Sequence, residues 1–247
     1  AFVCSKEVNS GLLKIGCMAR KAIAAIFRSR FPHLYSTLDA PTEVPVQIAA
    51  YQLAAYKYIQ PGDSVLDVGF GLGYGLKMMA EKAGKLVGIE IDRRAVSHAK
   101  GLVQEVPMIQ EVRHYDGLHI PYDAGHFDVV TCVDVIEHVP NYMALIMEMV
   151  RVSRRTVLMS TPNRRPEYTR PDGRPKNYWH LREWSYRELD FILQEIPGVS
   201  IYWNFLNGSW SGPFEVSSIV SKNTLALTPV LMLVSPKQGQ DNTRCQD

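Results

Sequence analysis

Short apolar runs recur along the chain, and several of them end in an acidic residue. The clearest are residues 65–67 (VLD), 85–92 (KLVGIEID) and 129–134 (VVTCVD). Nearly continuous apolar runs of this kind are typical of strands buried on both faces of a parallel sheet. Segments in which apolar residues recur every three or four positions lie between them. Strands that alternate with helices in this way predict an α/β fold.

Seven strands are expected from this pattern, at Val65–Val68, Lys85–Asp92, Val112–Gly117, Val129–Val133, Thr156–Thr161, Val199–Phe205 and Val230–Val234. Five helices are expected, at Leu12–Phe27, Pro45–Tyr58, Leu76–Ala83, Asn141–Val150 and Ser185–Gly198. Two of them carry start signals. Asn141 is a candidate N-cap, and Ser185 with Glu188 has the spacing of a capping box. Gly198 is expected to close the last helix.

The sequence VLDVGFGLGYG places a glycine at every second position from Gly69 to Gly75, directly after Asp67. Glycine amides can approach a ligand with no Cβ in the way, and open α/β sheets bind ligands beyond the carboxyl ends of their strands. The spacing excludes the dinucleotide fingerprint G-x-G-x-x-G, because Tyr74 or Leu76 stands at the last glycine. A phosphate loop is excluded as well, because no Gly-Lys-Ser/Thr follows. The alternative is a glycine-rich turn that binds nothing.

An acidic residue followed by G-x-G-x-G resembles motif I of the class I S-adenosylmethionine-dependent methyltransferases. The resemblance covers about residues 51–236 and thins out after Asn163. It implies that Glu90, 23 positions after Asp67, binds the ribose hydroxyls. It also implies that Asp116 accepts a hydrogen bond from the adenine amino group. The cofactor site implied by the resemblance is Asp67, Gly69, Gly71, Gly73, Glu90, Ile91, Asp116, Gly117, Val133 and Asp134.

Two of these acids also have a plain structural interpretation. Glu90 could be an ordinary charge at a strand end, and Asp116-Gly117 is a common turn dipeptide. The order of Asp67, Glu90 and Asp116 along the chain, with Phe-Asp at 127–128 opening the next strand, favours the cofactor interpretation.

The segment DVIEHV, from Asp134 to Val139, follows the fourth expected strand. If it starts a helix, Asp134, Glu137 and His138 share one face. The D-x-x-E-H spelling resembles a subset of small-molecule methyltransferases that includes the O-methyltransferases of ubiquinone biosynthesis. Three roles stay open. His138 could be a general base, the trio could bind a divalent cation, or Glu137 and His138 could brace the helix. No residue is assigned as a metal ligand.

Residues 164–184 (RRPEYTRPDGRPKNYWHLREW) form a long segment that mixes arginines with aromatic residues. Long loops without secondary structure are usually functional or disordered, and the aromatic residues argue against disorder. Arginine pairs well with carboxylate or phosphate, so an acidic or sugar-linked acceptor is one expectation and a solvated insertion is the other. His180 is a second candidate base, because its H-x-x-x-W-S spelling resembles that of related enzymes. The candidate catalytic residues are therefore His138, His180 and Glu137.

The expected fold is a Rossmann-like, mostly parallel sheet of seven strands in the order 3-2-1-4-5-7-6, with one antiparallel strand and helices on both faces. We expect a helix and cover segment over 1–44, a methyltransferase domain over 45–236 and a polar tail over 237–247. Within the domain, 164–184 and 207–224 are expected to be insertions on the substrate side.

Composition narrows the choice of partner and compartment. A net charge of +2 argues against nucleic acid as the main partner. The four cysteines are scattered without metal-ligand spacing, which favours a reducing compartment. No apolar run reaches the length of a membrane span and no signal-peptide pattern is visible, so a cytoplasmic location is expected. The basic amphipathic helix over residues 12–27 could contact a membrane surface, although such helices more often dock on their own protein.

These expectations combine into an enzyme that uses S-adenosylmethionine to methylate an oxygen or nitrogen of a small-molecule acceptor. One rival is another α/β enzyme, which uses a nucleotide sugar or a nicotinamide cofactor. The other is a catalytically silent module that binds S-adenosylmethionine. The acceptor and the oligomeric state do not follow from the sequence.

Overall fold

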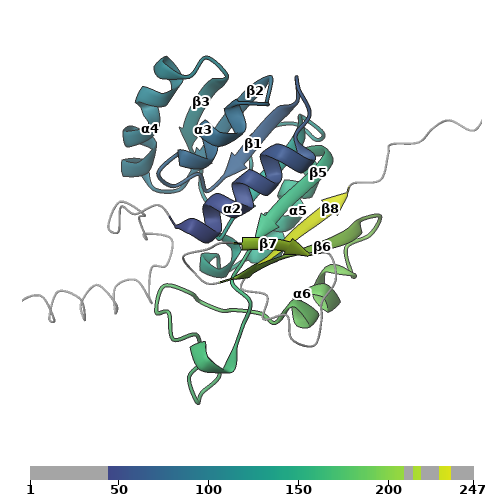
Figure 1. Cartoon of the computed structure of the whole chain (residues 1–247). Coiled ribbons are helices and arrows are strands. Elements are labelled where there is room, and N and C mark those ends of the chain that lie inside the picture. The colour runs from purple at the N-terminus through teal and green to yellow at the C-terminus, as the bar shows by residue number, and fades with distance from the viewer. Residues whose placement is uncertain (1–43, 209–213, 218–227, 235–247) are drawn as a thin grey trace, which may run out of the picture.

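The computed structural model describes residues 44–208, 214–217 and 228–234 (Figure 1). Three expectations lie outside these residues: the amphipathic helix over 12–27, the cover segment over 31–42 and the polar tail over 237–247. Of the insertion expected over 207–224, only its first two residues and 214–217 are described. Within the described parts of the chain, no helix has the length and apolar character needed to cross a membrane.

One eight-stranded sheet organises the molecule, in the order β3-β2-β1-β4-β5-β8-β6-β7. Neighbouring strands among β1 to β5 are parallel, and β8 is antiparallel to both β5 and β6. The predicted order of seven strands is therefore confirmed, with β8 in the seventh position. The bounds are β1 (Ser64–Val68), β2 (Lys85–Glu90), β3 (Ile109–His114), β4 (Phe127–Val133), β5 (Ser153–Ser160), β6 (Ser200–Gly208), β7 (Phe214–Ser217) and β8 (Thr228–Val234).

The sheet has one strand more than predicted. Strand β7 pairs antiparallel with the end of β6, from Phe205↔Ser217 to Gly208↔Phe214. It lies within the segment expected to be a substrate-side insertion, so this part of the segment extends the sheet instead. Among the seven predicted strands β8 alone runs antiparallel, as expected, and the additional β7 is a second antiparallel strand.

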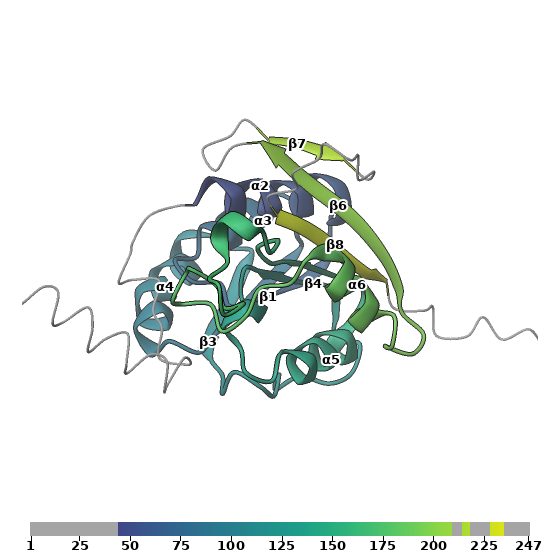
Figure 2. The same cartoon turned by 90° about the horizontal axis from the view of Figure 1, so that it is seen from below.

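Helices cover both faces of the sheet, as predicted (Figure 2). Neighbouring residues of β1 show the two sides: Val65 packs with the core under α2, α3 and α4, and Leu66 packs with the core under α5 and α6. The helices are α2 (Pro45–Leu53), which continues as a π-helix η3 (Ala54–Tyr58), α3 (Tyr74–Ala80), α4 (Arg93–Glu105), α5 (Tyr142–Val152) and α6 (Tyr186–Leu193), with short 3-10 turns η4 (Ile136–His138) and η5 (Pro166–Tyr168).

Several helix ends differ from the predictions. The capping box of α6 is present, because Ser185 and Glu188 bind each other's backbone amides. The helix nevertheless ends at Leu193, so Gly198 does not close it. Asn141 precedes α5 but makes no side-chain cap hydrogen bond. Helix α4 was not predicted, although Asp92 caps it by accepting a hydrogen bond from the amide of Arg94.

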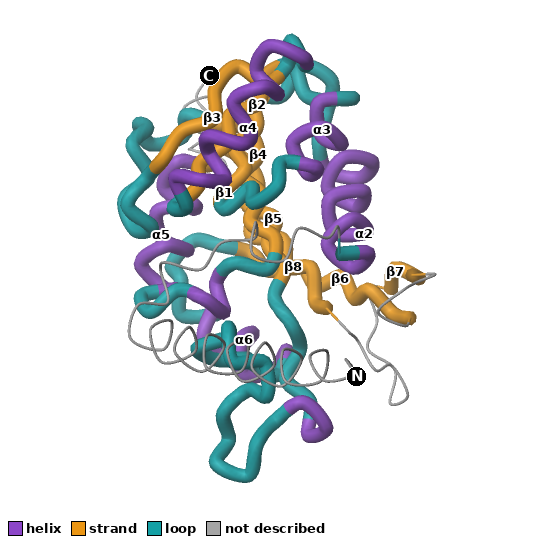
Figure 3. Tube along the Cα trace, turned by 90° about the vertical axis from the view of Figure 1, so that its left-hand side faces the viewer, coloured by secondary structure: helices purple, strands orange, loops and turns teal. Residues whose placement is uncertain are grey.

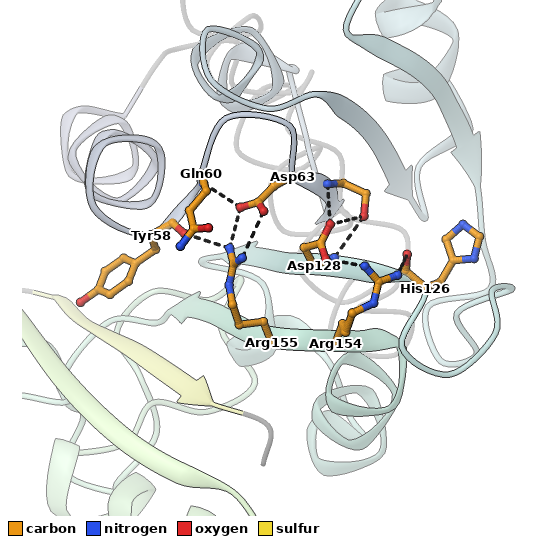
Figure 4. Close-up of polar contacts among 8 residues, drawn as sticks. Tyr58, Gln60, Asp63, His126, Asp128, Arg154 and Arg155 are labelled. Atoms are coloured by element: carbon orange, nitrogen blue, oxygen red, sulfur yellow. Dashed lines mark hydrogen bonds and ion pairs between the residues drawn. The ribbon is translucent and has the colours of Figure 1, made fainter. Parts of the chain in front are cut away.

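Arginines of β5 stabilise the edge of the sheet where β1 and β4 begin (Figure 4). Arg155 pairs with the buried carboxylate of Asp63 and donates a hydrogen bond to the carbonyl of Tyr58. Beside it, Asp128 accepts hydrogen bonds from Ser64 and pairs with Arg154. These contacts connect the amino ends of three strands and lie at the edge opposite to the strands' carboxyl ends.

Candidate cofactor and active site

The carboxyl ends of β3, β2, β1 and β4 lie side by side, because these strands are parallel and adjacent in the sheet. Every residue predicted to bind the cofactor lies at or just beyond one of these ends. The topology therefore brings the predicted cofactor residues to one edge of the sheet, where open α/β sheets bind their ligands.

The glycine loop after β1 has a backbone that favours glycine. Gly69, Gly71 and Gly73 all have positive φ angles, of 77°, 54° and 81°. A Cβ on Gly69 would lie 2.5 Å from a methyl group of Val135, and one on Gly73 would lie 2.6 Å from Leu102. The amide of Gly69 donates a 2.8 Å hydrogen bond to the carbonyl of Ile89 in the neighbouring strand.

Glu90, at the end of β2, connects this loop to its own strand. Its carboxylate accepts hydrogen bonds from the amides of Gly71 (3.0 Å), Ile91 (2.8 Å) and Asp92 (3.0 Å). Burial raises its pKa, although the three amides oppose that shift. A buried carboxylate directed at the glycine loop does not fit the interpretation of Glu90 as an ordinary exposed charge.

Asp67 is fully buried at the end of β1. Its carboxylate accepts hydrogen bonds from the hydroxyl of Tyr51 (3.2 Å to Oδ2) and from the hydroxyl of Thr131 (2.8 Å to Oδ1). Burial raises the pKa of Asp67 to about 7, and these hydrogen bonds limit the shift. Tyr51 was missed at the sequence level, since it is one of several apolar and aromatic residues of α2.

Asp116 and Gly117 form the exposed turn after β3. One carboxylate oxygen of Asp116 accepts from the amides of Leu118 (2.8 Å) and His119 (2.7 Å), and these bonds lower its pKa. Gly117 has a φ of 84°, and a Cβ there would lie 2.7 Å from the side chain of Ile91. The turn interpretation of Asp-Gly is therefore correct for the backbone, and Ile91 packs against that turn.

The backbone after β4 departs from the helix expected there. Val133 is buried at the strand's end, and Asp134 has a left-handed φ of 52°. The carboxylate of Asp134 accepts a 2.6 Å hydrogen bond from the hydroxyl of Ser160 in β5. Only Ile136–His138 forms a 3-10 turn, so Asp134 does not share a helical face with Glu137 and His138. The shared helical face is therefore absent, because the left-handed backbone of Asp134 cannot start a right-handed helix.

Glu137 and His138 meet His180 instead. The imidazole rings of His138 and His180 are 5.0 Å apart, and His138 Nε2 lies 4.0 Å from Oε1 of Glu137. Thr161 donates to the other oxygen of Glu137, whereas Oε1 is buried with no hydrogen-bond partner in the described part of the chain. One ligand atom from each of the three residues falls within 4.8 Å of the others, close enough to hold a metal ion.

The environment of His138 determines its protonation state. Burial and the nearby His180 lower its pKa to about 4, so the ring is neutral at pH 7. Its Nδ1 lies 2.9 Å from the carbonyl oxygen of Trp179. A carbonyl only accepts, so Nδ1 carries the proton and Nε2, on the side of Glu137, does not.

His180 belongs to a network that was only partly predicted. Its Nδ1 lies 2.5 Å from the buried carboxylate of Glu183, and its Nε2 lies 2.8 Å from the side-chain amide of Asn177. The amide of Leu181 donates to the carbonyl of Glu137, which fixes this segment against η4. Glu183 and Asn177 were missed; the only sequence signal is their spacing of three residues on either side of His180.

The loop over 164–184 projects from the sheet and carries η5 (Figures 1 and 3). Its ends are joined, because the amide of Arg164 donates to the carbonyl of Trp184. Most of its arginines bind protein groups. The pairs are Arg164 with Glu188, Arg165 with Glu167, Arg174 with Asp172, and Arg182 with the carbonyl of Pro140 and the ring of Tyr142. Four of the five arginines that suggested an acidic acceptor therefore have side-chain partners within the chain.

Comparison with known proteins agrees with this geometry. Residues 66–159, which include the end of β1, the glycine loop and η4, match the family model of a methyltransferase domain. A probable S-adenosylmethionine-dependent methyltransferase of Mycolicibacterium smegmatis is 33% identical over 148 residues, which cover 58% of this chain and 54% of that protein. Over these residues the chain is similar to S-adenosylmethionine-dependent methyltransferases.

A second curated protein and one solved structure show how far the similarity extends. The ubiquinone biosynthesis O-methyltransferase of Hahella chejuensis is 35% identical over 111 residues, which cover 43% of this chain and 46% of that protein. The YcgJ protein of Bacillus subtilis has the same fold, with a TM-score of 0.58 at 15% identity over 77% of this chain and 98% of that one. The chain spans about half the length of the curated relatives it matches.

Proposed function

We propose that this methyltransferase transfers the methyl group of S-adenosylmethionine to an oxygen or nitrogen of a small-molecule acceptor. One observation supports this proposal most strongly. The glycine loop, the buried Glu90 and the exposed Asp116 lie together at one edge of the sheet. Glu137 and His138 lie beside them. In this proposal Glu90 binds the ribose, Asp116 the adenine amino group and the loop amides the methionine part.

The reaction would be an in-line displacement at the sulfonium methyl carbon. The acceptor's lone pair forms the new bond as the carbon–sulfur bond breaks, and S-adenosylhomocysteine leaves. The leaving group is already activated, so positioning and exclusion of water supply most of the acceleration. A base is needed only where the acceptor is a hydroxyl.

His138 is the proposed base. It is neutral at pH 7 and its unprotonated Nε2 is directed toward Glu137, so it can accept a proton without first losing one. His180, oriented by Glu183, is the second candidate. Glu137 would stabilise the imidazolium that forms.

A divalent cation is the competing role for the same residues. The unpartnered oxygen of Glu137 supports it, as does the hydrogen bond between His138 Nδ1 and a carbonyl, which is common for metal-bound histidines. A cation there would lower the pKa of an acceptor hydroxyl. Both ring nitrogens of His180 already have partners in Glu183 and Asn177, which argues against His180 as a metal ligand and favours His138 as the base.

Calorimetry with S-adenosylhomocysteine tests the cofactor assignment. Replacing Glu90 by Ala is expected to weaken binding by roughly 1 to 3 kcal/mol, as for lost hydrogen bonds to a charged group. Glu105→Ala, which removes an exposed acid at the end of α4, is the matched control and should bind as the wild type does. Unchanged affinity of Glu90→Ala would remove Glu90 from the site. Thermal stabilisation by NAD but not by S-adenosylhomocysteine would favour the nicotinamide rival.

Release of S-adenosylhomocysteine across a panel of acceptors tests for catalysis. Phenols, amines, carboxylic acids and phosphorylated sugars would cover the acceptor classes. Tight binding without turnover on any of them would favour the silent binding module. With an acceptor in hand, His138→Ala should slow turnover and leave cofactor affinity intact, while exposed His98→Ala should change neither. Loss of turnover on chelation, restored by added Mg²⁺ or Mn²⁺, would assign the cluster to a metal.

A further inference from the structure

Residues 118–122, between the Asp116 turn and β4, have no regular secondary structure. Two side chains of α5 nevertheless hold this segment by its backbone. The carboxylate of Glu148 accepts from the amide of Ile120 (3.0 Å), and Arg151 donates to the carbonyls of Ile120 (2.9 Å) and Tyr122 (2.8 Å). Both polar groups of the Ile120 peptide backbone are thus bound by one acid–base pair.

Glu148 and Arg151 also bind each other directly. Arg151 donates two hydrogen bonds to Glu148, of 2.6 Å and 2.7 Å, in the bidentate arrangement that guanidinium and carboxylate favour. These bonds hold the pKa of Glu148 at about 2, so the pair is charged at any pH at which the protein would be assayed.

His119 connects the pair to Asp116. Its imidazole Nδ1 lies 3.0 Å from the carboxylate of Glu148, and its amide donates a 2.7 Å hydrogen bond to Asp116. The side chain of Ile120 is fully buried, which anchors the next residue. A short path of direct contacts therefore leads from α5 to the carboxylate assigned to adenine.

We propose that Glu148 and Arg151 are positioning residues that set the affinity for the adenine ring by fixing the Asp116 turn. The proposal rests on the proposed function, since it takes Asp116 to bind the adenine amino group. Holding a loop in its binding conformation before the ligand arrives increases affinity, because less ordering remains for the binding step. The pair would act through the backbone, without touching the cofactor.

Arg151→Met removes the donors and keeps the apolar stem of the side chain. Arg154→Met is the matched control, because Arg154 binds Asp128 and the carbonyl of His126 at the opposite edge of the sheet. Binding is measured by calorimetry for S-adenosylhomocysteine and for its inosine analogue, which lacks the adenine amino group. Comparing the two ligands separates an effect on the contact with the adenine amino group from a general loss of structure, which would weaken both.

We expect Arg151→Met to bind S-adenosylhomocysteine about tenfold more weakly, and the inosine analogue nearly as the wild type does. The affinity of Arg151→Lys for S-adenosylhomocysteine should lie between those of the wild type and Arg151→Met, because one ammonium group cannot replace all the donors of a guanidinium. Equal weakening of both ligands, or no weakening of either, would overturn the proposal. If Arg151→Met does not fold, Arg151→Lys and Glu148→Gln are judged by the same ratio of affinities. A wild-type protein that binds neither ligand would instead overturn the proposed function.

Discussion

The hydroxyl of Tyr51, on the helix before β1, donates a hydrogen bond to the buried carboxylate of Asp67, 16 residues further along the chain. The ring of Tyr51 also covers Gly75 and meets the ring of Tyr74 edge-on. A residue of α2 thus contacts the end of β1 and the start of α3, the two elements that flank the glycine loop. The position of α2 and the protonation of Asp67 are therefore linked.

This link predicts a specific dependence of stability on pH. Burial raises the pKa of Asp67 from 3.8 in the unfolded chain to about 7, so folding favours the protonated form. This contribution to the unfolding free energy is complete below pH 3.8 and is lost as the pH rises through about 7. It is on the order of 4 kcal/mol. In urea unfolding, Asp67→Asn should therefore lose less stability than the wild type between pH 5 and pH 8. Asp172→Asn, an exposed acid, should follow the wild type. Parallel curves for Asp67→Asn and the wild type would contradict the assignment.

Tyr51→Phe tests the hydrogen bond without disturbing the ring. Phenylalanine still covers Gly75 but leaves the buried carboxyl group with only Thr131 as a side-chain donor. The loss should cost about 1 to 3 kcal/mol of unfolding free energy. Tyr56→Phe, in the π-helix η3 that follows α2 and 68% exposed, should be neutral. The hydrogen bond would be unimportant if both variants unfolded at the same urea concentration.

A pair of glycine substitutions tests the close approach of Tyr51. Gly75 and Gly101 both lie in helices, α3 and α4, so alanine removes the conformational-entropy cost of glycine at both. At Gly75 the new Cβ would overlap the ring of Tyr51, whereas at Gly101 the nearest atom is 3.8 Å away. Gly75→Ala should destabilise by about 1 to 3 kcal/mol and Gly101→Ala should stabilise by about 0.5 to 1 kcal/mol. Differential scanning calorimetry would show melting shifts of opposite sign, and stabilisation by Gly75→Ala would mean that α2 does not sit there.

The parts of the fold that could be predicted are those that depend on residues close together in the sequence. Continuous apolar runs such as Val129–Val133 indicated the parallel strands, and the positive φ angles of the glycine loop explain why glycines recur there. Strand β7 could not be predicted in this way. It has only four residues, and its pairing with the end of β6 is what defines it.

The candidate site shows the same division. Glu90 and Asp116 were found because each follows a predictable strand. The contact of Tyr51 with Asp67 and the approach of His180 to His138 depend on segments 16 and 42 residues apart meeting in space. The left-handed backbone of Asp134 was hidden for a related reason, since its hydrogen bond to Ser160 exists only in the folded sheet.

The ion pair of Arg155 with Asp63 supports a final prediction, at the edge of the sheet away from the site (Figure 4). Asp63 is 7% exposed, and its two carboxylate oxygens accept from the guanidinium at 3.1 Å and 2.5 Å. Arg155→Met would leave a buried carboxylate without that cation, which should cost about 2 kcal/mol of unfolding free energy. Arg174→Met breaks a pair on the exposed loop and should cost nothing measurable. Adding Asp63→Asn should recover part of the loss, because the uncompensated charge is then gone. An Arg155→Met protein as stable as Arg174→Met would show that the pair does not hold the strands together.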